Sequence, residues 1–128
     1  MDLLLDTHAF IWFLNGDNQL PVGVRNLVAD TTNRCFLSIA SLWEIAIKNS
    51  LGKLTMQGSF SQLAIFLNEN AIEVLPVTFE HIRRLLQLEY FHRDPFDRMI
   101  LAQSLTENIT LVSKDEAFRR YGASLLWK

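Results

Sequence analysis

The chain opens on Met1-Asp2-Leu3-Leu4-Leu5-Asp6, a short apolar run that ends in an acid. Consecutive leucines over so few residues are typical of a strand that is buried on both faces of a parallel sheet. The next segment, 7–14, has the apolar pattern of a helix, and the Asn15-Gly16 pair ends it. This strand-and-helix unit predicts an α/β fold.

Strand-like and helix-like segments alternate along the rest of the chain. Such alternation implies βαβ units, so we expect residues 1–128 to form one domain, a three-layer α/β/α sandwich with a mainly parallel central sheet. Ser41 and Glu44 match a capping box at the start of the third helix. Further strands are expected at 35–39, 73–76, 110–113 and 123–127, and further helices at 21–30, 42–51, 59–70, 78–88, 97–107 and 115–121.

The composition limits the classes of protein. With 128 residues and 49% hydrophobic residues, the chain is long enough for a real core, and its net charge of −2 argues against a basic protein that coats nucleic acid. The single cysteine, Cys35, is expected in the core, which fits a reducing compartment. There is no signal-peptide pattern and no apolar stretch near the roughly 18 residues that span a membrane. We therefore expect a cytoplasmic protein that does not bind membranes.

Four acids stand where predicted strands end or helices begin: Asp6, Glu44, Asp97 and Asp115. The carboxyl ends of parallel strands share one edge of the sheet, and ligands bind there. Desolvated carboxylates repel one another unless a cation holds them. Because the predicted ligands are all oxygen atoms, the sequence favours Mg²⁺ or Mn²⁺ at this edge.

Each acid also has a simpler interpretation. Asp6 and Asp115 can cap helices, Glu44 can complete the capping box, and Asp97 can interact with a helix dipole. A protein-binding module whose acids only cap helices is therefore the non-enzyme alternative. Two enzyme-like alternatives, a phosphotransfer receiver and a phosphatase of the haloacid dehalogenase type, lack support, because Thr7-His8 follows Asp6 where those classes need a further acid.

Four motifs in this order carry a resemblance to a known family. They are Leu5-Asp6-Thr7-His8, then 38–45 (SIASLWEI), 92–98 (HRDPFDR) and 111–115 (LVSKD). Together they resemble the PIN-domain ribonucleases of the VapC type, the toxins of toxin–antitoxin systems. The resemblance implies a Rossmann-like fold, Mg²⁺ or Mn²⁺ as cofactor, cleavage of RNA, and inhibition by a cognate antitoxin.

The resemblance also assigns roles to residues. The catalytic and metal-binding acids fall on Asp6, Glu44, Asp97 and Asp115, with Asp6 and Asp97 as the principal ligands. The last motif has the hydroxyl of Ser113 where the family often has threonine. Ser113 and Thr7 are expected to support the site, and Asp94 either assists it or orders the loop. The expected reaction is attack of a metal-activated water on phosphorus.

Other residues are expected to bind the substrate and partners. Arg93, Arg98 and Lys48 lie close in sequence to the acids and are candidates for phosphate contacts. No histidine or cysteine set has zinc-like spacing, and His8, His81 and His92 are dispersed, so no histidine is needed as a base. The run 10–14 (FIWFL) is too apolar for one buried helix stripe, so part of it should contact a second subunit or the antitoxin. We expect a homodimer.

Overall fold

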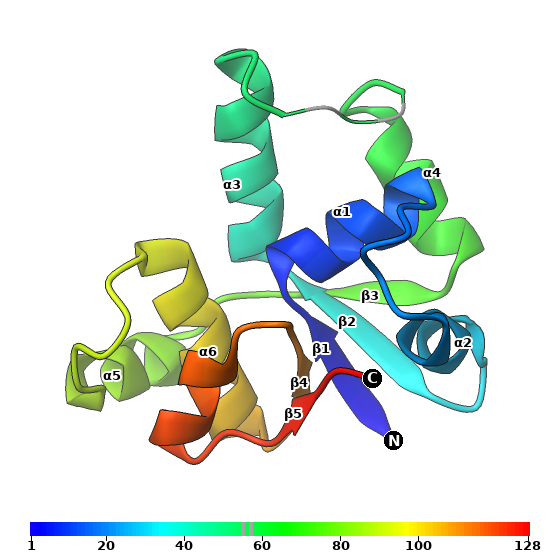
Figure 1. Ribbon diagram of the computed structural model, residues 1–128. Coiled ribbons are helices and arrows are strands. Elements are labelled where there is room, and N and C mark those ends of the chain that lie inside the picture. The colour runs from blue at the N-terminus through cyan, green and yellow to red at the C-terminus, as the bar shows by residue number, and fades with distance from the viewer. Residues whose placement is uncertain (55, 57) are drawn as a thin grey trace.

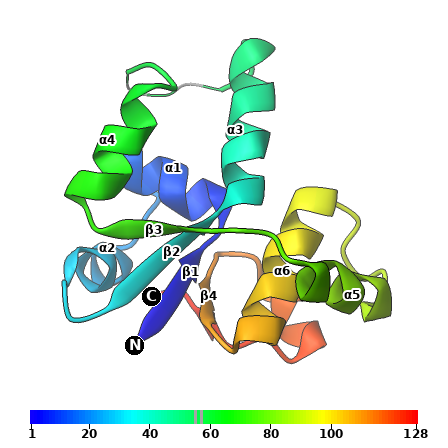
Figure 2. The same ribbon diagram turned by 180° about the vertical axis from the view of Figure 1, so that it is seen from behind.

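The computed structural model describes residues 1–54, 56 and 58–128. Its described residues form a five-stranded, fully parallel sheet in the order β3-β2-β1-β4-β5 (Figures 1 and 2). The strands are β1 (Asp2–Leu5), β2 (Arg34–Ser38), β3 (Ile72–Leu75), β4 (Thr110–Val112) and β5 (Leu125–Leu126). The helices are α1 (Thr7–Asn15), α2 (Val22–Ala29), α3 (Ile39–Ser50), α4 (Gln62–Glu69), α5 (Phe79–Gln87), α6 (Pro95–Glu107) and the 3₁₀ helix η1 (Glu116–Tyr121).

The leucines of β1 divide the core between two helical layers. Leu3 and Leu5 pack with side chains of α1, α2 and α4, whereas Leu4 packs with α6 and with Phe118 of η1. All three leucines are at most 1% exposed, as expected for a central strand covered on both faces. Figure 1 shows α1, α2 and α4 on one side of the sheet and α5 and α6 on the other. The predicted three-layer α/β/α sandwich is thus confirmed.

The strand register fixes which residues meet at the carboxyl edge. Leu5 of β1 pairs with Leu37 of β2 and with Val112 of β4. The Asp6 N–H then donates to the Val112 carbonyl at 3.0 Å, so this alignment extends one residue beyond β1. The segments that follow β1, β2 and β4 therefore leave the sheet together, and the predicted acids lie on these segments and on the helices after them.

The start of α3 differs from the sequence prediction. The helix begins at Ile39 rather than at residue 42, because the Ser38 hydroxyl at the end of β2 accepts a hydrogen bond from the Ala40 N–H at 3.0 Å. Ser41 therefore lies inside the helix, and the predicted capping box between Ser41 and Glu44 is wrong. Glu44 lies in the second turn of α3 and does not take part in capping the helix.

The apolar run 10–14 packs partly inside the protein. Phe10 and Ile11 are buried, and Phe13 and Trp12 contact the rings of Phe66 and Trp127 at 5.8 and 5.9 Å between centroids. Trp12, Phe13 and Leu14 remain partly exposed, so the expected contact of this run with a partner stays a prediction. Large exposed apolar side chains also lie on α3 and α5, among them Ile39, Trp43, Phe79, Ile82 and Leu86. Among the described residues, no helix is both long and apolar enough to cross a membrane.

Candidate active site

Asp6 directly follows β1 and is both a helix cap and a member of the site. Its Oδ1 accepts a hydrogen bond from the Ala9 N–H at 2.8 Å, which caps α1. The side chain is buried, and this burial raises the pKa of Asp6, although a hydrogen bond with Ser113 opposes the shift. The capping role and the functional role predicted for this acid are therefore compatible.

Glu44 is held by groups from α1 and α3. The Thr7 hydroxyl donates to Glu44 Oε1 at 2.8 Å and lies 2.9 Å from the Ser41 hydroxyl. Lys48, one helical turn further along α3, donates to Glu44 Oε2 at 2.7 Å, and this bond raises the pKa of Lys48. We call Thr7, Ser41, Glu44 and Lys48 the Glu44 half of the site. In this half, the charge of the buried acid is balanced by a cation on the same helix.

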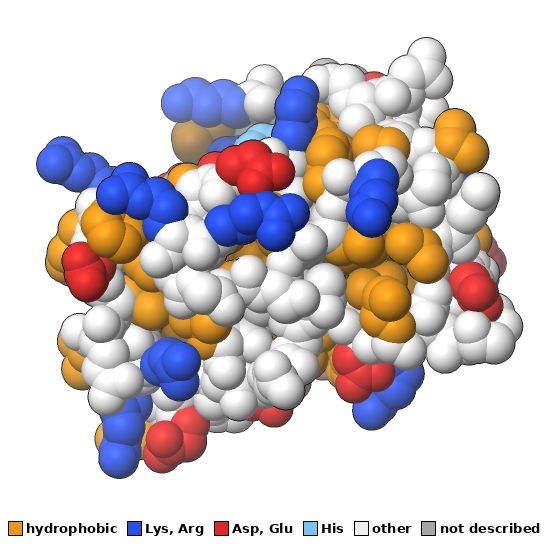
Figure 3. Space-filling model, turned by 60° about the horizontal axis from the view of Figure 1, so that its bottom comes forward, with side chains coloured by type: hydrophobic (Ala, Val, Ile, Leu, Met, Phe, Trp, Pro, Cys, Tyr) orange, Lys and Arg blue, Asp and Glu red, His pale blue; other side chains and the backbone are white. Residues whose placement is uncertain are grey.

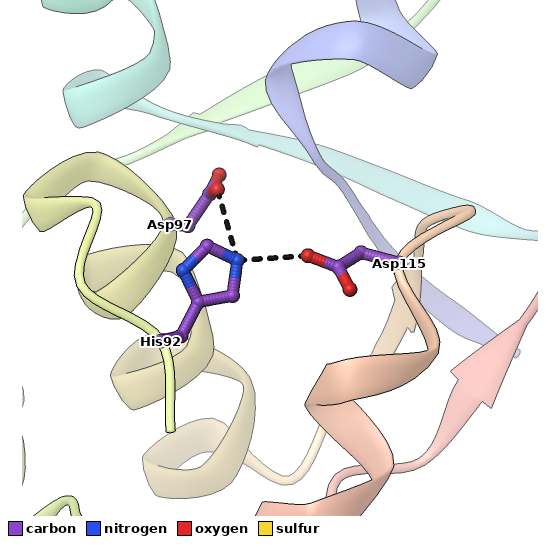
Figure 4. A group of neighbouring side chains, drawn as sticks. All are labelled: His92, Asp97 and Asp115. Atoms are coloured by element: carbon purple, nitrogen blue, oxygen red, sulfur yellow. Dashed lines mark hydrogen bonds and ion pairs between the residues drawn. The ribbon is translucent and has the colours of Figure 1, made fainter. Parts of the chain in front are cut away.

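The other acids surround a histidine that comes from the loop before α6. His92 Nε2 lies 2.8 Å from Asp115 Oδ2 and 3.3 Å from Asp97 Oδ2 (Figure 4). One ligating atom of each of these three residues lies within 4.8 Å of the others. We call His92, Asp97 and Asp115 the His92 half. Figure 4 shows that Asp97 of α6 and Asp115 of the segment before η1 approach the same ring nitrogen.

Asp97 is the acid that its surroundings perturb most clearly. Burial and then the charge of Asp94 raise the pKa of Asp97 to about 7, with smaller contributions from Asp6 and Glu44, while His92 opposes the shift. The charge of Asp115 likewise contributes to raising the pKa of Asp6. The four predicted acids therefore interact electrostatically as one site. A desolvated carboxylate repelled by several acids favours a bound cation, and the carboxylate donors fit Mg²⁺ or Mn²⁺.

His92 is the site residue that sequence reasoning missed. Its ring stacks on Phe118 at 5.2 Å with an angle of 8° between the planes. Its backbone N–H donates to the Tyr121 hydroxyl at 2.8 Å, and its carbonyl accepts from Arg98 at 3.0 Å. The position of His92 in the motif 92–98 was a signal, but its spacing alone did not reveal that Asp115, which is distant in sequence, lies beside it.

Arg98 differs from its predicted role. The side chain is 5% exposed, and its guanidinium donates to the carbonyls of residues 85, 88, 89 and 92. This geometry argues against the predicted RNA contact, because the donors of Arg98 are occupied in holding the loop that carries His92. Arg93 is exposed, and Lys48 keeps 39% of its side chain exposed beside Glu44. Both side chains are reached by solvent, although Lys48 is paired with Glu44.

The supporting residues order the backbone around the acids. Asp94 accepts from the N–H groups of Phe96 and Asp97 at 2.9 and 3.1 Å, so it caps α6. The buried Ser113 hydroxyl accepts from the Asp115 N–H at 3.0 Å as well as interacting with Asp6. Ser113 thus links the acids that follow β1 and β4, whereas Asp94 acts through the start of the helix that bears Asp97.

A cleft opens directly beside the acids. It measures about 370 Å³, and its walls include Asp6, Asp115, Trp12 and Lys114. On the face in Figure 3, Lys and Arg side chains are dispersed among acidic and hydrophobic ones.

Comparisons with known proteins identify the fold and the family of this chain. The chain is similar to VapBC2 from Rickettsia felis bound to a promoter DNA fragment, with a TM-score of 0.76 and 21% identity over 100% of each chain. It is also similar to DNA-bound VapBC from Salmonella typhimurium, with a TM-score of 0.70 and 18% identity over 98% of this chain and 97% of that chain. The similarity to VapBC-5 from Mycobacterium tuberculosis, a member of the VapBC family of toxin–antitoxin systems, has a TM-score of 0.58 and 19% identity over 98% of this chain and 95% of that chain. At these identities the similarity shows the fold. The curated protein sequences contain no match. The profile of the PIN domain matches residues 3–124, and the chain therefore belongs to the PIN domain family.

Proposed function

We propose that residues 1–128 form one PIN-like nuclease domain that hydrolyses RNA phosphodiester bonds with Mg²⁺ or Mn²⁺ as its cofactor. The observation that carries this proposal is the electrostatic coupling of Asp6, Glu44, Asp97 and Asp115 at one edge of the sheet. Asp6 and Asp115 cap helices at this edge, but Glu44 and Asp97 cap none, so capping alone does not account for the cluster. Asp97, with its pKa raised to about 7, is a poor place for a bare negative charge and a good place for a cation's ligand.

Asp6 and Asp97 are the proposed principal ligands, and Glu44 and Asp115 complete the set. These residues would hold a divalent cation, which would supply an acidified water molecule and would offset negative charge on the phosphate and the leaving oxygen. The chain's other groups fix these ligands in place. Thr7 and Lys48 hold the Glu44 carboxylate, and Ser113 bonds to Asp6 and to the backbone of Asp115.

The substrate would lie across the acids with its phosphates near the neighbouring cations. Arg93 is exposed and lies one residue before the cap of α6, and Lys48 reaches the Glu44 carboxylate from α3. Lys114 lines the cleft beside Asp115. Such contacts position a nucleic acid without reading its sequence. The RNA preference of the enzyme would therefore depend on the shape of the cleft.

We further propose that the protein is the toxin of a toxin–antitoxin pair and acts in the cytoplasm. The support is the match to the PIN domain family and the fold shared with VapBC-5, a member of the VapBC family of toxin–antitoxin systems. A homodimer is also part of this proposal. Its support is the apolar surface of α3 and α5, where Trp43 is 65% and Ile82 is 48% exposed. Both side chains line a hollow of about 560 Å³.

The test of the nuclease is cleavage by the purified chain of a panel of single-stranded and structured RNAs. Each RNA is incubated with a chelator, with Mg²⁺ or with Mn²⁺, beside the variant Asp6→Asn. Asparagine is also a good N-cap, so this variant keeps the start of α1 while losing the charge. We expect cleavage that requires metal and that the variant lacks. Cleavage that survives chelation, or that is unchanged in Asp6→Asn, would overturn the proposal.

A further inference from the structure

His92 places a nitrogen atom among acids that were expected to offer oxygen ligands alone. Nε2 lies 2.8 Å from Asp115 Oδ2 and 3.3 Å from Asp97 Oδ2. Neighbouring ligands of an octahedral ion, each about 2.1 Å from it, are separated by about 3 Å. Both distances from the nitrogen are thus close to what adjacent ligands of one ion require, and one oxygen of each acid lies within 4.8 Å of the other.

The histidine ring is fixed from several sides before any ion binds. Its face stacks on Phe118, which is 1% exposed, and its backbone is held by Tyr121 and by the buried guanidinium of Arg98. The side chain itself is 16% exposed, so solvent reaches it although most of its surface is covered. A ligand that is already ordered loses little conformational entropy when it binds. This rigidity favours a role for the nitrogen in binding over a chance contact.

We propose that Nε2 of His92 is a direct ligand of the cation held by Asp97 and Asp115, and that this ligand makes the site prefer Mn²⁺ to Mg²⁺. Mg²⁺ binds almost entirely through oxygen, whereas imidazole suits transition-metal ions. A mixed site with one imidazole and several carboxylates still accepts Mn²⁺, which tolerates both kinds of ligand. The inference rests on the proposed function, because it adds a ligand to the same site.

The first test reads the metal's neighbours directly and requires no RNA. The purified chain is loaded with one equivalent of Mn²⁺, and pulsed electron paramagnetic resonance measures coupling to coordinated ¹⁴N. We expect this coupling in the wild type, a change to ¹⁵N coupling after labelling of histidine with ¹⁵N, and loss of the coupling in His92→Gln. Glutamine keeps a polar side chain of similar reach but provides no ring nitrogen.

His8→Gln is the matched control. His8 is exposed and lines the cleft beside Asp6 and Asp115, so it is the other histidine placed near the acids. The third, His81, is fully buried, and its ring nitrogens are engaged with Thr78 and Glu107. The nitrogen coupling should survive in His8→Gln. If His92→Gln fails to fold, survival of the coupling in His8→Gln, with ¹⁵N-labelled wild type, still assigns it to His92.

The second test measures the affinities for Mn²⁺ and Mg²⁺ by calorimetry. We expect the wild type to bind Mn²⁺ at least about tenfold more tightly than Mg²⁺, and His92→Gln to reduce this preference by about tenfold. Mn²⁺ that binds without coordinated nitrogen, or an unchanged preference in His92→Gln, would overturn the assignment of His92 and leave the proposed nuclease intact. Failure of Mn²⁺ to bind at all would overturn both.

Discussion

The two halves of the site treat a buried acid in different ways. In the Glu44 half, the carboxylate receives a hydrogen bond from Thr7 and an ion pair from Lys48, both at 2.8 Å or less. In the His92 half, Asp97 and Asp115 share one histidine, and the pKa of Asp97 is raised to about 7. The charge of Glu44 is compensated by Lys48, whereas in the His92 half burial and neighbouring acids make the negative charge of Asp97 unfavourable.

This difference suggests a division of roles. A compensated acid is stable in the metal-free protein and can be positioned precisely by its partners. An acid surrounded by other acids destabilises the metal-free fold, and this stored repulsion favours cation binding, since the ion relieves it. The His92 half would thus supply much of the driving force for binding. The following predictions test this contrast, from the largest expected effect to the smallest.

Replacing Asp97 should have the largest effect on cleavage. Asp97→Asn removes a proposed principal ligand while keeping the side chain's shape, so we expect RNA cleavage to fall by about 100-fold or more. The measurement is single-turnover cleavage of a labelled RNA at saturating Mn²⁺. Asp94→Asn is the matched control three residues earlier, because asparagine retains the cap of α6, and its activity should stay within a few-fold of wild type. Equal losses in both variants would show that cleavage depends on the start of α6 and not on Asp97 as a ligand.

Arg98→Lys should reduce the stability of the His92 half. Lysine keeps the charge but has no planar fork, so it cannot donate to the four carbonyls that Arg98 contacts. We expect the free energy of unfolding to fall by about 2–3 kcal/mol in denaturant titrations. Arg93→Lys changes an exposed arginine in the same loop and should be within about 0.5 kcal/mol of wild type. Similar stabilities for the two variants would show that Arg98 does not hold the loop.

Lys48→Met should leave the buried Glu44 carboxylate without the cation that compensates its charge. Glu44 is 4% exposed. Among the described contacts, Thr7 and Lys48 are the side chains that donate to its carboxylate, so the variant would keep the hydrogen bond from Thr7 alone. We expect a loss of about 1–2 kcal/mol in the metal-free protein, less than for a fully buried pair because Lys48 is partly exposed. Lys53→Met, an exposed lysine just beyond α3, is the control. No difference between the two variants would mean that the ion pair does not compensate Glu44.

The pH dependence of stability should differ between wild type and Asp97→Asn. The folded pKa of Asp97, about 7, is above its ordinary value of 3.8, so the folded state holds this proton more tightly than the unfolded state. Between about pH 4 and pH 7 the metal-free wild type should lose stability as the pH rises. The variant lacks this contribution and should show a shallower fall, by about 2–5 °C in Tm. Parallel curves would contradict the raised pKa, since the shifted pKa of Asp6 is common to both proteins.

Much of the fold and of the acid cluster could be predicted from the sequence. Buried strands reveal themselves through apolar runs such as 3–5, and parallel strands bring their carboxyl ends to one edge, so Asp6 and Asp115 could be brought together without a structure. The start of α3 could not be fixed, because Ser38 and Ser41 are both good caps locally. The end of β2 depends on its pairing with neighbouring strands.

The environments of Arg98 and His92 could not be predicted in the same way. Arginine is usually exposed, and the carbonyls that bury Arg98 belong to the end of α5 and the loop after it. His92 meets Asp115 across 23 residues of sequence, so the contact exists only once β4 is placed beside β1. Local patterns predict which residue types gather at an edge of the sheet. They do not predict which side chains are held rigidly there.

The most direct test of the contrast between the halves is a melting series of wild type and Asp97→Asn, first with a chelator and then with increasing Mn²⁺ or Mg²⁺. We predict that the metal-free variant melts at or above wild type, because relief of repulsion outweighs the helix-dipole benefit of about 0.3–1 kcal/mol that Asp97 supplies. Wild type should gain more stability from the metal than the variant, since the ion binds the folded state. A metal-free variant that melts well below wild type, with identical responses to metal in the two proteins, would show that Asp97 only stabilises the start of α6 and is not a ligand.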